Sequence, residues 1–289
     1  MFRYYLEILF FRILFSFINL FSLRAARRIG RILGLLNYYI VKVRIDVVKR
    51  QLKECFPQKS GRELQQLVKQ INISSGYTGV EFCWFSSKQY NDIKDYITIK
   101  GEKHLWEALK RNKGCIIFSG HFGNWELAAQ VFGSISEGIY AVAKKQRNPY
   151  FNDLINKLRR ANNIHLIDKK FALRGIVNAL KKNKLILMLG DQNAGKTGVP
   201  ATFFGLTAPT NPGSAKIAIK FGVPVIFAIC YRRHDGRFVL QMNEPITLKV
   251  ATDSDEAVHE YTQFFTSELE QWIRKIPWQW FWFHRRWKV

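Results

Sequence analysis

Short apolar runs alternate with helical patterns between residues 96 and 189, and this alternation constrains the fold more than any other feature of the sequence. Runs rich in β-branched and aromatic residues predict strands, and the longer segments between them predict helices. Strands that alternate with helices form a largely parallel central sheet flanked by helices, so we expect a mixed α/β fold of this kind. The expected strands are 96–99, 115–119, 138–142, 164–167 and 184–189, and the expected helices are 102–111, 124–132, 150–161 and 172–182.

The segments outside this alternation are mostly helical. Ser60 and Glu63 have the spacing of a capping box, which predicts that a long helix begins there and continues to about residue 85. Near the C-terminus, Asp253 and Glu256 have the same spacing and predict the start of a last helix. Between these regions we also expect a loop of roughly twenty residues after Asp191, a helix at 213–221 and a strand at 223–228.

Several polar residues follow directly after expected strands. His121 follows one strand, Lys144 and Lys145 follow the next along the chain, and Asp191 follows a later one. In open parallel sheets, ligands bind beyond the carboxyl ends of the strands. We therefore expect these side chains to share one cleft.

His121 lies in a Gly-His-Phe-Gly-Asn-Trp-Glu string at 120–126, between a strand and a helix. A neutral imidazole can take a proton from a hydroxyl, and a carboxylate on its other nitrogen would fix its tautomer. We expect Glu126 to supply that carboxylate, and backbone amides near Gly123 and Trp125 to hold an oxyanion. The alternative is that His121 merely packs in the turn and Glu126 is a solvated helix-start acid.

Residues 1–23 are almost continuously apolar and lead into a run of arginines at 24–31. The stretch after Arg12 is too short to span ~30 Å of hydrocarbon, and the whole stretch from Tyr4 could span only with Glu7 near one end and Arg12 neutralised or snorkelling. We therefore favour an interfacial or half-inserted helix anchored by basic residues on the cytoplasmic face. The alternative is a buried core helix. We therefore divide the chain into a membrane-associating segment, 1–40, and a main domain, 41–289.

The chain carries 45 Lys and Arg against 22 Asp and Glu, a formal net charge of +23. Such a charge suits an anionic partner, which could be nucleic acid, acidic lipid or an acidic carrier protein. Basic residues are spread along the sequence without a nucleic-acid-binding motif, so we do not expect nucleic acid as a partner. The four cysteines are scattered and form no ligand pattern, so we expect neither a metal site nor a disulfide framework.

The string at 120–126 resembles the first motif of the lipid A late acyltransferases, the lauroyl and myristoyl transferases within the wider lysophospholipid and glycerolipid acyltransferase superfamily. Further motifs of that family follow in order, with a Lys-Lys-Gln-Arg-Asn-Pro turn at 144–149, an Asp-Gln pair at 191–192, Phe-Phe-Gly at 203–205 and Pro-Trp-Gln-Trp-Phe-Trp-Phe-His-Arg-Arg at 277–286. The resemblance implies a catalytic role for His121 and Glu126. It implies substrate-binding roles for Gly123, Asn124, Arg147, Asn148, Arg159, Asp191, Gln192, Phe203 and Phe204.

The resemblance also implies an activity and a location. The chain would be an O-acyltransferase at the cytoplasmic side of the inner membrane, with no cofactor. It would move a fatty acyl chain from acyl carrier protein, or from coenzyme A, to a hydroxyl of a lipid A precursor or a similar anionic glycolipid. A lysophospholipid or other glycolipid acyltransferase is the alternative within this class, and a non-enzymatic protein that binds acidic membrane or nucleic acid is the alternative outside it. The C-terminal aromatic and basic residues would suit lipid headgroups.

Overall fold

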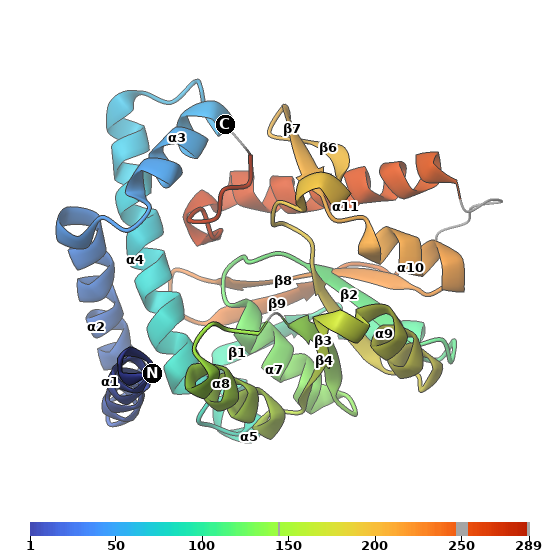
Figure 1. The fold of residues 1–289 in the computed structure, drawn as a ribbon, viewed down its shortest axis with the longest axis horizontal. Coiled ribbons are helices and arrows are strands. Elements are labelled where there is room, and N and C mark those ends of the chain that lie inside the picture. Colours follow the sequence, from blue (N-terminus) through green and yellow to red (C-terminus); the bar gives the residue numbers. More distant parts are fainter. Residues whose placement is uncertain (144, 247–253, 288–289) are drawn as a thin grey trace.

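A computed structural model of the chain describes residues 1–143, 145–246 and 254–287, so Lys144 and Asp253 lie outside the described part. Its centre is a seven-stranded sheet with the strand order β1-β9-β8-β2-β5-β3-β4. All neighbouring strands are parallel except β8 and β9, which are antiparallel. The expectation of an α/β fold with a largely parallel sheet is confirmed (Figure 1).

The strands expected from the alternating pattern are present, with boundaries that differ by one or two residues. Two features were not expected. Strand β9 adds an antiparallel pair to β8, and the supposed loop after Asp191 contains a two-stranded hairpin, β6 and β7. The strands are β1 Ile97–Lys100, β2 Cys115–Ser119, β3 Ile139–Ala143, β4 Ile164–Asp168, β5 Leu185–Leu189, β6 Val199–Phe203, β7 Leu206–Thr210, β8 Val225–Arg232 and β9 Phe238–Met242.

Helices cover both faces of the sheet, with α7 and α8 on one side and α10 and α11 on the other (Figure 1). Successive residues of β2 alternate between the two apolar clusters, because side chains alternate across a strand. Ile116 and Phe118 face the cluster that includes α10 and α11, whereas Cys115 and Ile117 face the one that includes α7. The helices of the sheet region are α5 Tyr90–Ile93, α6 Glu102–Leu109, α7 Trp125–Ile135, α8 Pro149–Ala161, α9 Ala172–Lys181, α10 Gly213–Phe221 and α11 Asp255–Lys275.

The first 85 residues form a helical wing along one edge of the sheet (Figure 1). The predicted capping box is confirmed, because the Ser60 side chain accepts from the Glu63 amide and Glu63 accepts from the Ser60 amide. The expected cap of the last helix is wrong in detail, since Ser254 caps α11 through the amide of Ala257. The wing consists of α1 Phe2–Asn19, α2 Leu23–Leu36, the π-helical turn η1 Asn37–Val41, α3 Ile45–Cys55 and α4 Gly61–Phe85.

Helices α2 and α4 touch backbone to backbone. A Cβ atom added at Gly76 would lie 2.0 Å from the carbonyl oxygen of Gly30, and one added at Gly34 would lie 2.4 Å from that of Asn72. Only glycine permits this approach, so α2 is fixed against the main domain rather than attached loosely to it. Within the described ranges, no helix is both long enough and apolar enough to cross a bilayer.

Candidate active site

His121 lies at the carboxyl edge of the sheet, in the turn between β2 and α7. Its ring Nδ1 is 2.7 Å from Oδ1 of Asp191, and its backbone N–H donates to Oδ2 of the same carboxylate at 2.9 Å. The indole N–H of Trp280 also donates to Oδ2, at 2.8 Å. A buried carboxylate accepts the Nδ1 proton in this arrangement, which leaves Nε2 of His121 as the proton acceptor.

The topology explains this contact. Strands β2 and β5 are parallel neighbours, with Ser119 paired to Leu189, so the residues that follow them emerge side by side. The expectation that His121 and Asp191 share one cleft is therefore confirmed. A single glycine separates each of these two residues from the end of its strand. The approach is close, because a Cβ atom added at Gly120 would lie 3.3 Å from the carboxyl carbon of Asp191.

The charges of the pair shift both pKa values. Burial opposes ionisation of Asp191, but the charge and hydrogen bonds of His121 and the Trp280 donor outweigh it and lower the pKa to about 2. Burial alone would lower the pKa of His121, yet the charge and hydrogen bond of Asp191 raise it above its ordinary value. An ionised Asp191 thus increases the basicity of His121, as a general base requires.

The expected contact between His121 and Glu126 is not the one found. Glu126 instead accepts two hydrogen bonds from Arg159, at 3.1 Å from Nε and 2.5 Å from Nη2, across the gap between α7 and α8. The backbone between His121 and Glu126 turns at Gly123, which has a left-handed conformation (φ 59°). Nδ1 of the His121 ring is already bonded to Asp191. Glu126 nevertheless remains close enough for its charge to contribute to the raised pKa of His121.

A cavity of about 350 Å³ opens beside the Glu126–Arg159 pair, and most of its lining surface is apolar. Glu126 and Arg159 contribute its charged wall, and Gln146 also lines it. Trp125 lines the cavity and separates it from the His121 ring, and the centroids of the two rings are 5.1 Å apart. The apolar lining comes from α1, α4, α7, α8 and the C-terminal segment, chiefly Phe11, Phe82, Trp125, Phe151, Ile155, Trp278 and Phe281.

A sequence profile of bacterial lipid A biosynthesis acyltransferases matches residues 1–289. The chain belongs to this family. It is 26% identical to a lipid A biosynthesis lauroyltransferase of Escherichia coli K12 over 91% of this chain and 85% of that protein. It is 25% identical to a lipid A biosynthesis palmitoleoyltransferase of the same strain over 90% and 84%. A phosphatidylinositol mannoside acyltransferase of Mycolicibacterium smegmatis is 23% identical over 46% of this chain and 45% of that protein.

The chain is therefore an acyltransferase, and Gln192 and His284 are two further polar side chains of its site. The amide nitrogen of Gln192 is 3.5 Å from Nε2. His284 accepts the backbone N–H of Asn193 on its own Nε2 at 3.0 Å, so this ring is neutral with its proton on Nδ1. Burial lowers the pKa of His284, which stabilises the same neutral form.

The C-terminal segment of the acyltransferase is part of its core, contrary to the expectation of a lipid-facing aromatic belt. Trp280 and Trp282 are buried, and so is Arg286. Arg286 donates to the carbonyl of Pro209 at 2.6 Å and also to the hydroxyl of Thr210, and burial lowers its pKa to about 10. The roles of Trp280 and Arg286 in holding Asp191 and the hairpin loop were missed, although their presence in a dense aromatic-basic motif could have indicated them.

Phe203 and Phe204 were expected to bind substrate, but they lie in this same core rather than in the large cavity. The Phe203 ring stacks on Trp287 at 5.4 Å, and the Phe204 ring meets Phe56 at 5.4 Å. Both side chains are buried. They support the loop that begins at Asp191 and do not line the cavity wall.

The expected oxyanion donors at the start of α7 are mostly occupied. The amide of Gly123 donates to the Gln279 carbonyl at 2.8 Å, and the amide of Asn124 donates to that of Cys230 at 2.9 Å. The Asn124 side chain is buried, where it caps α7 through the amide of Leu127. Gly123 and Asn124 thus position the turn through their own amides, whereas an oxyanion-binding role for the amide of Trp125 stays a prediction.

Asn124 also contacts a buried ionic network below the turn. Its amide donates to Glu81 of α4 at 3.3 Å. Glu81 is fully buried and pairs with Arg27 of α2 at 2.6 Å and with Arg232 of β8 at 2.5 Å. These contacts connect the helical wing to the sheet directly beneath the residues that carry the histidine. Thr78 completes the link by donating to the carbonyl of Gly123.

Asn148 and Arg147, in the basic turn before α8, differ in their surroundings. Asn148 is buried, caps α8 through the amides of Tyr150 and Phe151, and donates to the Tyr4 carbonyl of α1 at 2.9 Å. Its role is therefore to join α8 to α1. Arg147 is exposed, so a substrate-binding role for it stays a prediction.

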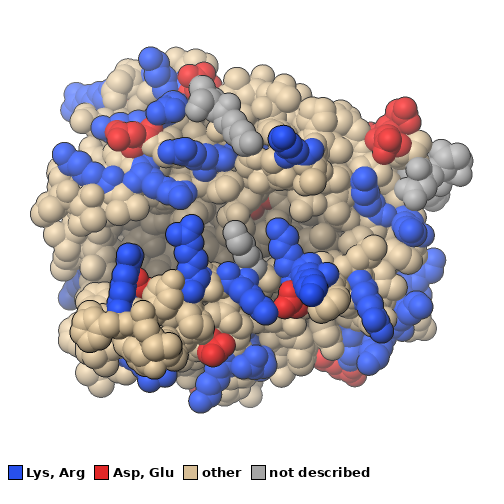
Figure 2. Space-filling view, in the orientation of Figure 1, with Lys and Arg blue, Asp and Glu red and all other residues tan. Residues whose placement is uncertain are grey.

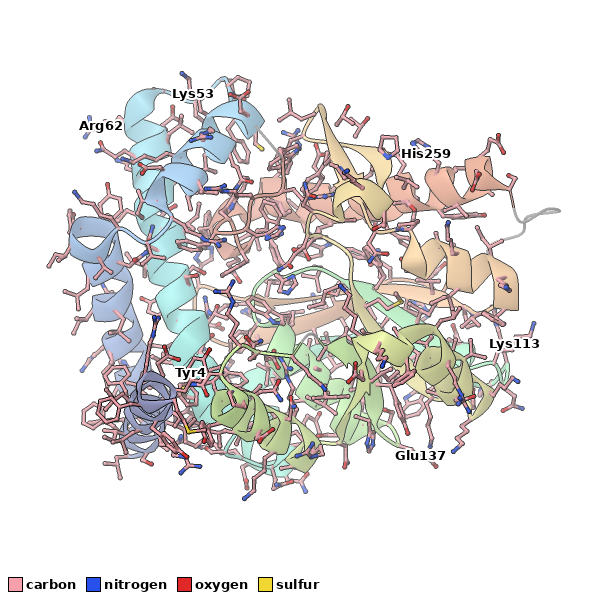
Figure 3. All side chains as sticks on the ribbon, viewed as in Figure 1. Tyr4, Lys53, Arg62, Lys113, Glu137 and His259 are labelled. Carbon is pink, nitrogen blue, oxygen red and sulfur yellow. The ribbon has the colours of Figure 1, made fainter. Side chains whose placement is uncertain are left out.

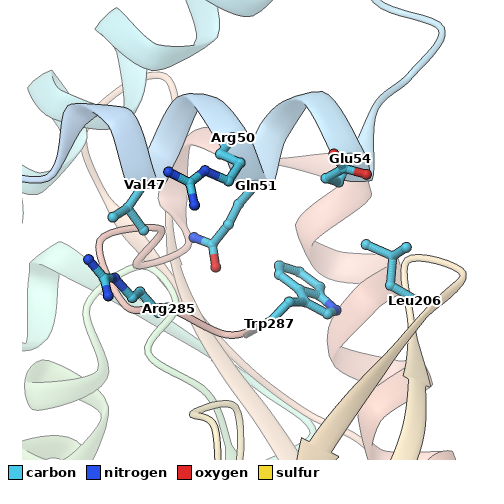
Figure 4. A pocket seen from close by; sticks show the side chains of 7 residues that line it. All are labelled: Val47, Arg50, Gln51, Glu54, Leu206, Arg285 and Trp287. Carbon is cyan, nitrogen blue, oxygen red and sulfur yellow. The ribbon is translucent and has the colours of Figure 1, made fainter. Parts of the chain in front are cut away.

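A second, much smaller pocket lies under α3 and holds about 30 Å³, the space of one or two water molecules (Figure 4). Gln51 projects from α3 towards the C-terminal segment, donates to the Trp282 carbonyl and accepts the Arg286 amide, both at 2.8 Å. This pocket is too small for an acyl chain. Lysines and arginines surround a hollow on the face shown in Figure 2, where their charge would attract anionic groups.

Proposed function

We propose that this protein transfers a fatty acyl group from a thioester, carried by acyl carrier protein or by coenzyme A, to a hydroxyl of a lipid A precursor or a similar anionic glycolipid. The observation that carries the proposal is the His121–Asp191 pair, which contacts Trp125 and Trp280 in the wall of a 350 Å³ cavity. Two relatives named for lauroyl and palmitoleoyl transfer in lipid A biosynthesis support the acceptor class.

The proposed reaction begins with the acceptor hydroxyl. His121 Nε2 takes its proton while the oxygen attacks the thioester carbonyl, and a tetrahedral oxyanion forms. Collapse of this intermediate breaks the carbon–sulfur bond, and the imidazolium returns its proton to the departing thiolate. The products are an ester and a free thiol, so no metal or redox cofactor enters the balance.

Asp191 has a defined task in this scheme. It fixes the Nδ1–H tautomer and stabilises the imidazolium that appears in the transition state. The side-chain amide of Gln192, close to Nε2, is suited to donate to the acceptor oxygen or to the oxyanion.

The cavity suits the acyl chain, because Phe11, Phe82, Phe151 and Ile155 offer a wall without polar groups. Arg159 lies at the charged side of the same cavity, where a guanidinium can contact a phosphate while Glu126 orients it. The half-length similarity to a phosphatidylinositol mannoside acyltransferase supports a second candidate, in which the acceptor is another anionic glycolipid.

The membrane is the proposed place of reaction. Helix α1 exposes a row of large apolar side chains, among them Phe2, Leu9, Phe10 and Ile13, and such a face is suited to lie in the interface of the inner membrane from its cytoplasmic side.

The decisive experiment incubates detergent-solubilised full-length protein with one acyl donor and one acceptor at a time. Donors are acyl carrier protein and coenzyme A thioesters of several chain lengths, and acceptors are a lipid A precursor, a phosphatidylinositol mannoside and a lysophospholipid. Mass spectrometry should find one acyl group added to the lipid A precursor. A protein that acylates only the lysophospholipid would refute the proposed acceptor, and His121→Ala is the inactive control.

A further inference from the structure

Helix α2 ends in a short projection with an unusual surface. The π-helical turn η1 and the residues after it expose Tyr39 by 57%, Ile40 by 70%, Val41 by 64% and Val43 by 56%. No residue of η1 is buried, and only Tyr38 packs partly against the core. Adjacent large apolar side chains exposed to this extent commonly mark a contact surface.

The projection has a fixed conformation. The Asn37 side chain accepts the Val43 amide at 3.0 Å and donates to Asn72 of α4 at 2.6 Å, so the turn is tied to the main domain. Lys42 and Arg44 both adopt left-handed backbone, with φ of 57° and 54°. Side chains other than glycine rarely take this conformation, and its cost is accepted where a segment must be displayed in one particular way.

The charges within the projection and in the chain before it have one sign. No Asp or Glu occurs between Glu7 and Asp46, whereas this interval contains seven arginines and lysines. Lys42 and Arg44 are exposed on either side of Val43. A second copy of a chain with a net charge of +23 would be repelled here, while an anionic bilayer would be attracted.

Further exposed apolar side chains lie on the two N-terminal helices that precede the projection. Helices α1 and α2 form one edge of the molecule, and α2 continues along that edge towards α3 (Figure 1). Ile32, Leu33 and Leu36 are exposed on α2 between the two ends of this edge. Apolar side chains flanked by basic residues are suited to the boundary between headgroups and acyl chains.

We propose that the projection formed by residues 37–43 inserts into an anionic bilayer as a second contact, separate from α1, and that the two contacts together set the orientation of the enzyme. This inference rests on the proposed function only in taking the membrane as the place of reaction. Helix α1 presents Phe11 to the large cavity while Phe10 and Ile13 are exposed, so one helix separates the bilayer from the cavity. Two contacts hold that helix against the lipid, so an acyl chain can reach the cavity from the membrane.

The first test measures binding of full-length protein to vesicles of three parts phosphatidylethanolamine to one part phosphatidylglycerol by co-sedimentation. I40S/V41S should weaken binding at least tenfold, equivalent to about 1.4 kcal/mol. F171S/L173S is the matched control, because Phe171 and Leu173 are exposed by 59% and 58%. They belong to the start of α9 and the turn before it, and α9 lies at the opposite side of the molecule from the helical wing (Figure 1). Equal binding by both double variants and the wild type would overturn the proposal.

The second test reports insertion directly. All four native cysteines are buried, so Ile40→Cys can be labelled selectively with an environment-sensitive fluorophore. Its emission should shift to the blue with anionic vesicles but not with buffer alone, and an unchanged spectrum would overturn insertion. A shift that depends on protein concentration without vesicles would instead indicate self-association and would also overturn it.

Acyl transfer in detergent separates this inference from the proposed function. I40S/V41S should retain wild-type turnover in micelles, because η1 lies outside the active site, and should lose it only on vesicles. A wild-type protein that binds vesicles through Ile40 but transfers no acyl group in micelles would refute the proposed function alone.

Discussion

Asp191→Asn tests the catalytic geometry most directly. The carboxylate accepts three hydrogen bonds, from the ring and backbone of His121 and from Trp280, and none of its neighbours offers a lone pair in exchange. An asparagine of the same shape must direct its NH₂ group at one of these donors. The ring can relieve this by moving its proton to Nε2, and the base is then lost. We expect kcat/KM to fall by about 10³–10⁴-fold, or ~4–5 kcal/mol of barrier.

The pH profile gives the sign of the effect. The base must be neutral, so activity falls as the pH decreases through the pKa of His121, which Asp191 raises above its ordinary 6.5. In Asp191→Asn only burial remains as the main influence, and it lowers the pKa. The acidic limb of kcat/KM should therefore lie above pH 6.5 in the wild type and move to lower pH in the variant.

Stability should change with pH in a related way. The lowered pKa of Asp191 contributes about 2 kcal/mol of stability, present above about pH 4 and lost as the pH falls towards 2. The raised pKa of His121 also stabilises the fold. This contribution is fully present below pH 6.5 and is lost as the pH rises through the pKa of His121 in the folded protein. Thermal unfolding of Asp191→Asn should thus differ most from the wild type between about pH 4 and 6.5.

The assay is acyl transfer followed by mass spectrometry from pH 5 to 9. Asp168→Asn is the matched control, because this aspartate also ends a strand of the sheet but pairs with an exposed lysine. A folded Asp191→Asn with kcat/KM within threefold of the wild type would refute the reasoning. So would a Glu126→Gln variant that moves the acidic limb while Asp191→Asn does not.

Three further predictions concern the surroundings of the site. Arg159→Ala should lower kcat/KM at least tenfold, equivalent to about 1.4 kcal/mol, in steady-state assays. Arg62→Ala, at the far end of the wing in Figure 3, should change kcat/KM little, and equal losses in the two variants would contradict an anion-binding role. Glu81→Ala leaves two arginines without their buried partner and should destabilise the fold by about 3–5 kcal/mol in thermal or urea unfolding, and a loss below about 1 kcal/mol would contradict this. Ile155→Ala enlarges the cavity and should shift preference towards longer acyl donors in competition assays, and an unchanged preference would exclude this wall as the limit on chain length.

The sequence was sufficient for the fold because its regular part is locally determined. The strand at 115–119, the capping box at Ser60 and the parallel sheet all follow from patterns within one or two elements. The position of His121 beyond a strand end followed from the same patterns. Strand β9, Phe238–Met242, was missed because it pairs antiparallel to β8 and follows it directly, outside the alternation of strands and helices that reveals parallel units.

The partner of His121 could not be read from local spacing. Glu126 is five positions away in sequence, yet Asp191 makes the contact because β2 and β5 are neighbours in the sheet. Sequence order does not give strand order, so the choice between two carboxylates depended on tertiary structure. The buried position of Arg286 was equally hidden, since a Trp–Arg-rich segment has the same composition in a core as at a lipid surface.

Three separate parts of the chain meet at the Asp191 carboxylate, and this has a consequence for folding kinetics. Its contacts to His121 and Trp280 join residues 70 and 89 positions apart, so they require closure of long loops. Such closures are slow because entropy is lost before the contacts form. During refolding, the helical circular dichroism signal should therefore recover before enzymatic activity does. A chain that has regained most of its helices will still be inactive.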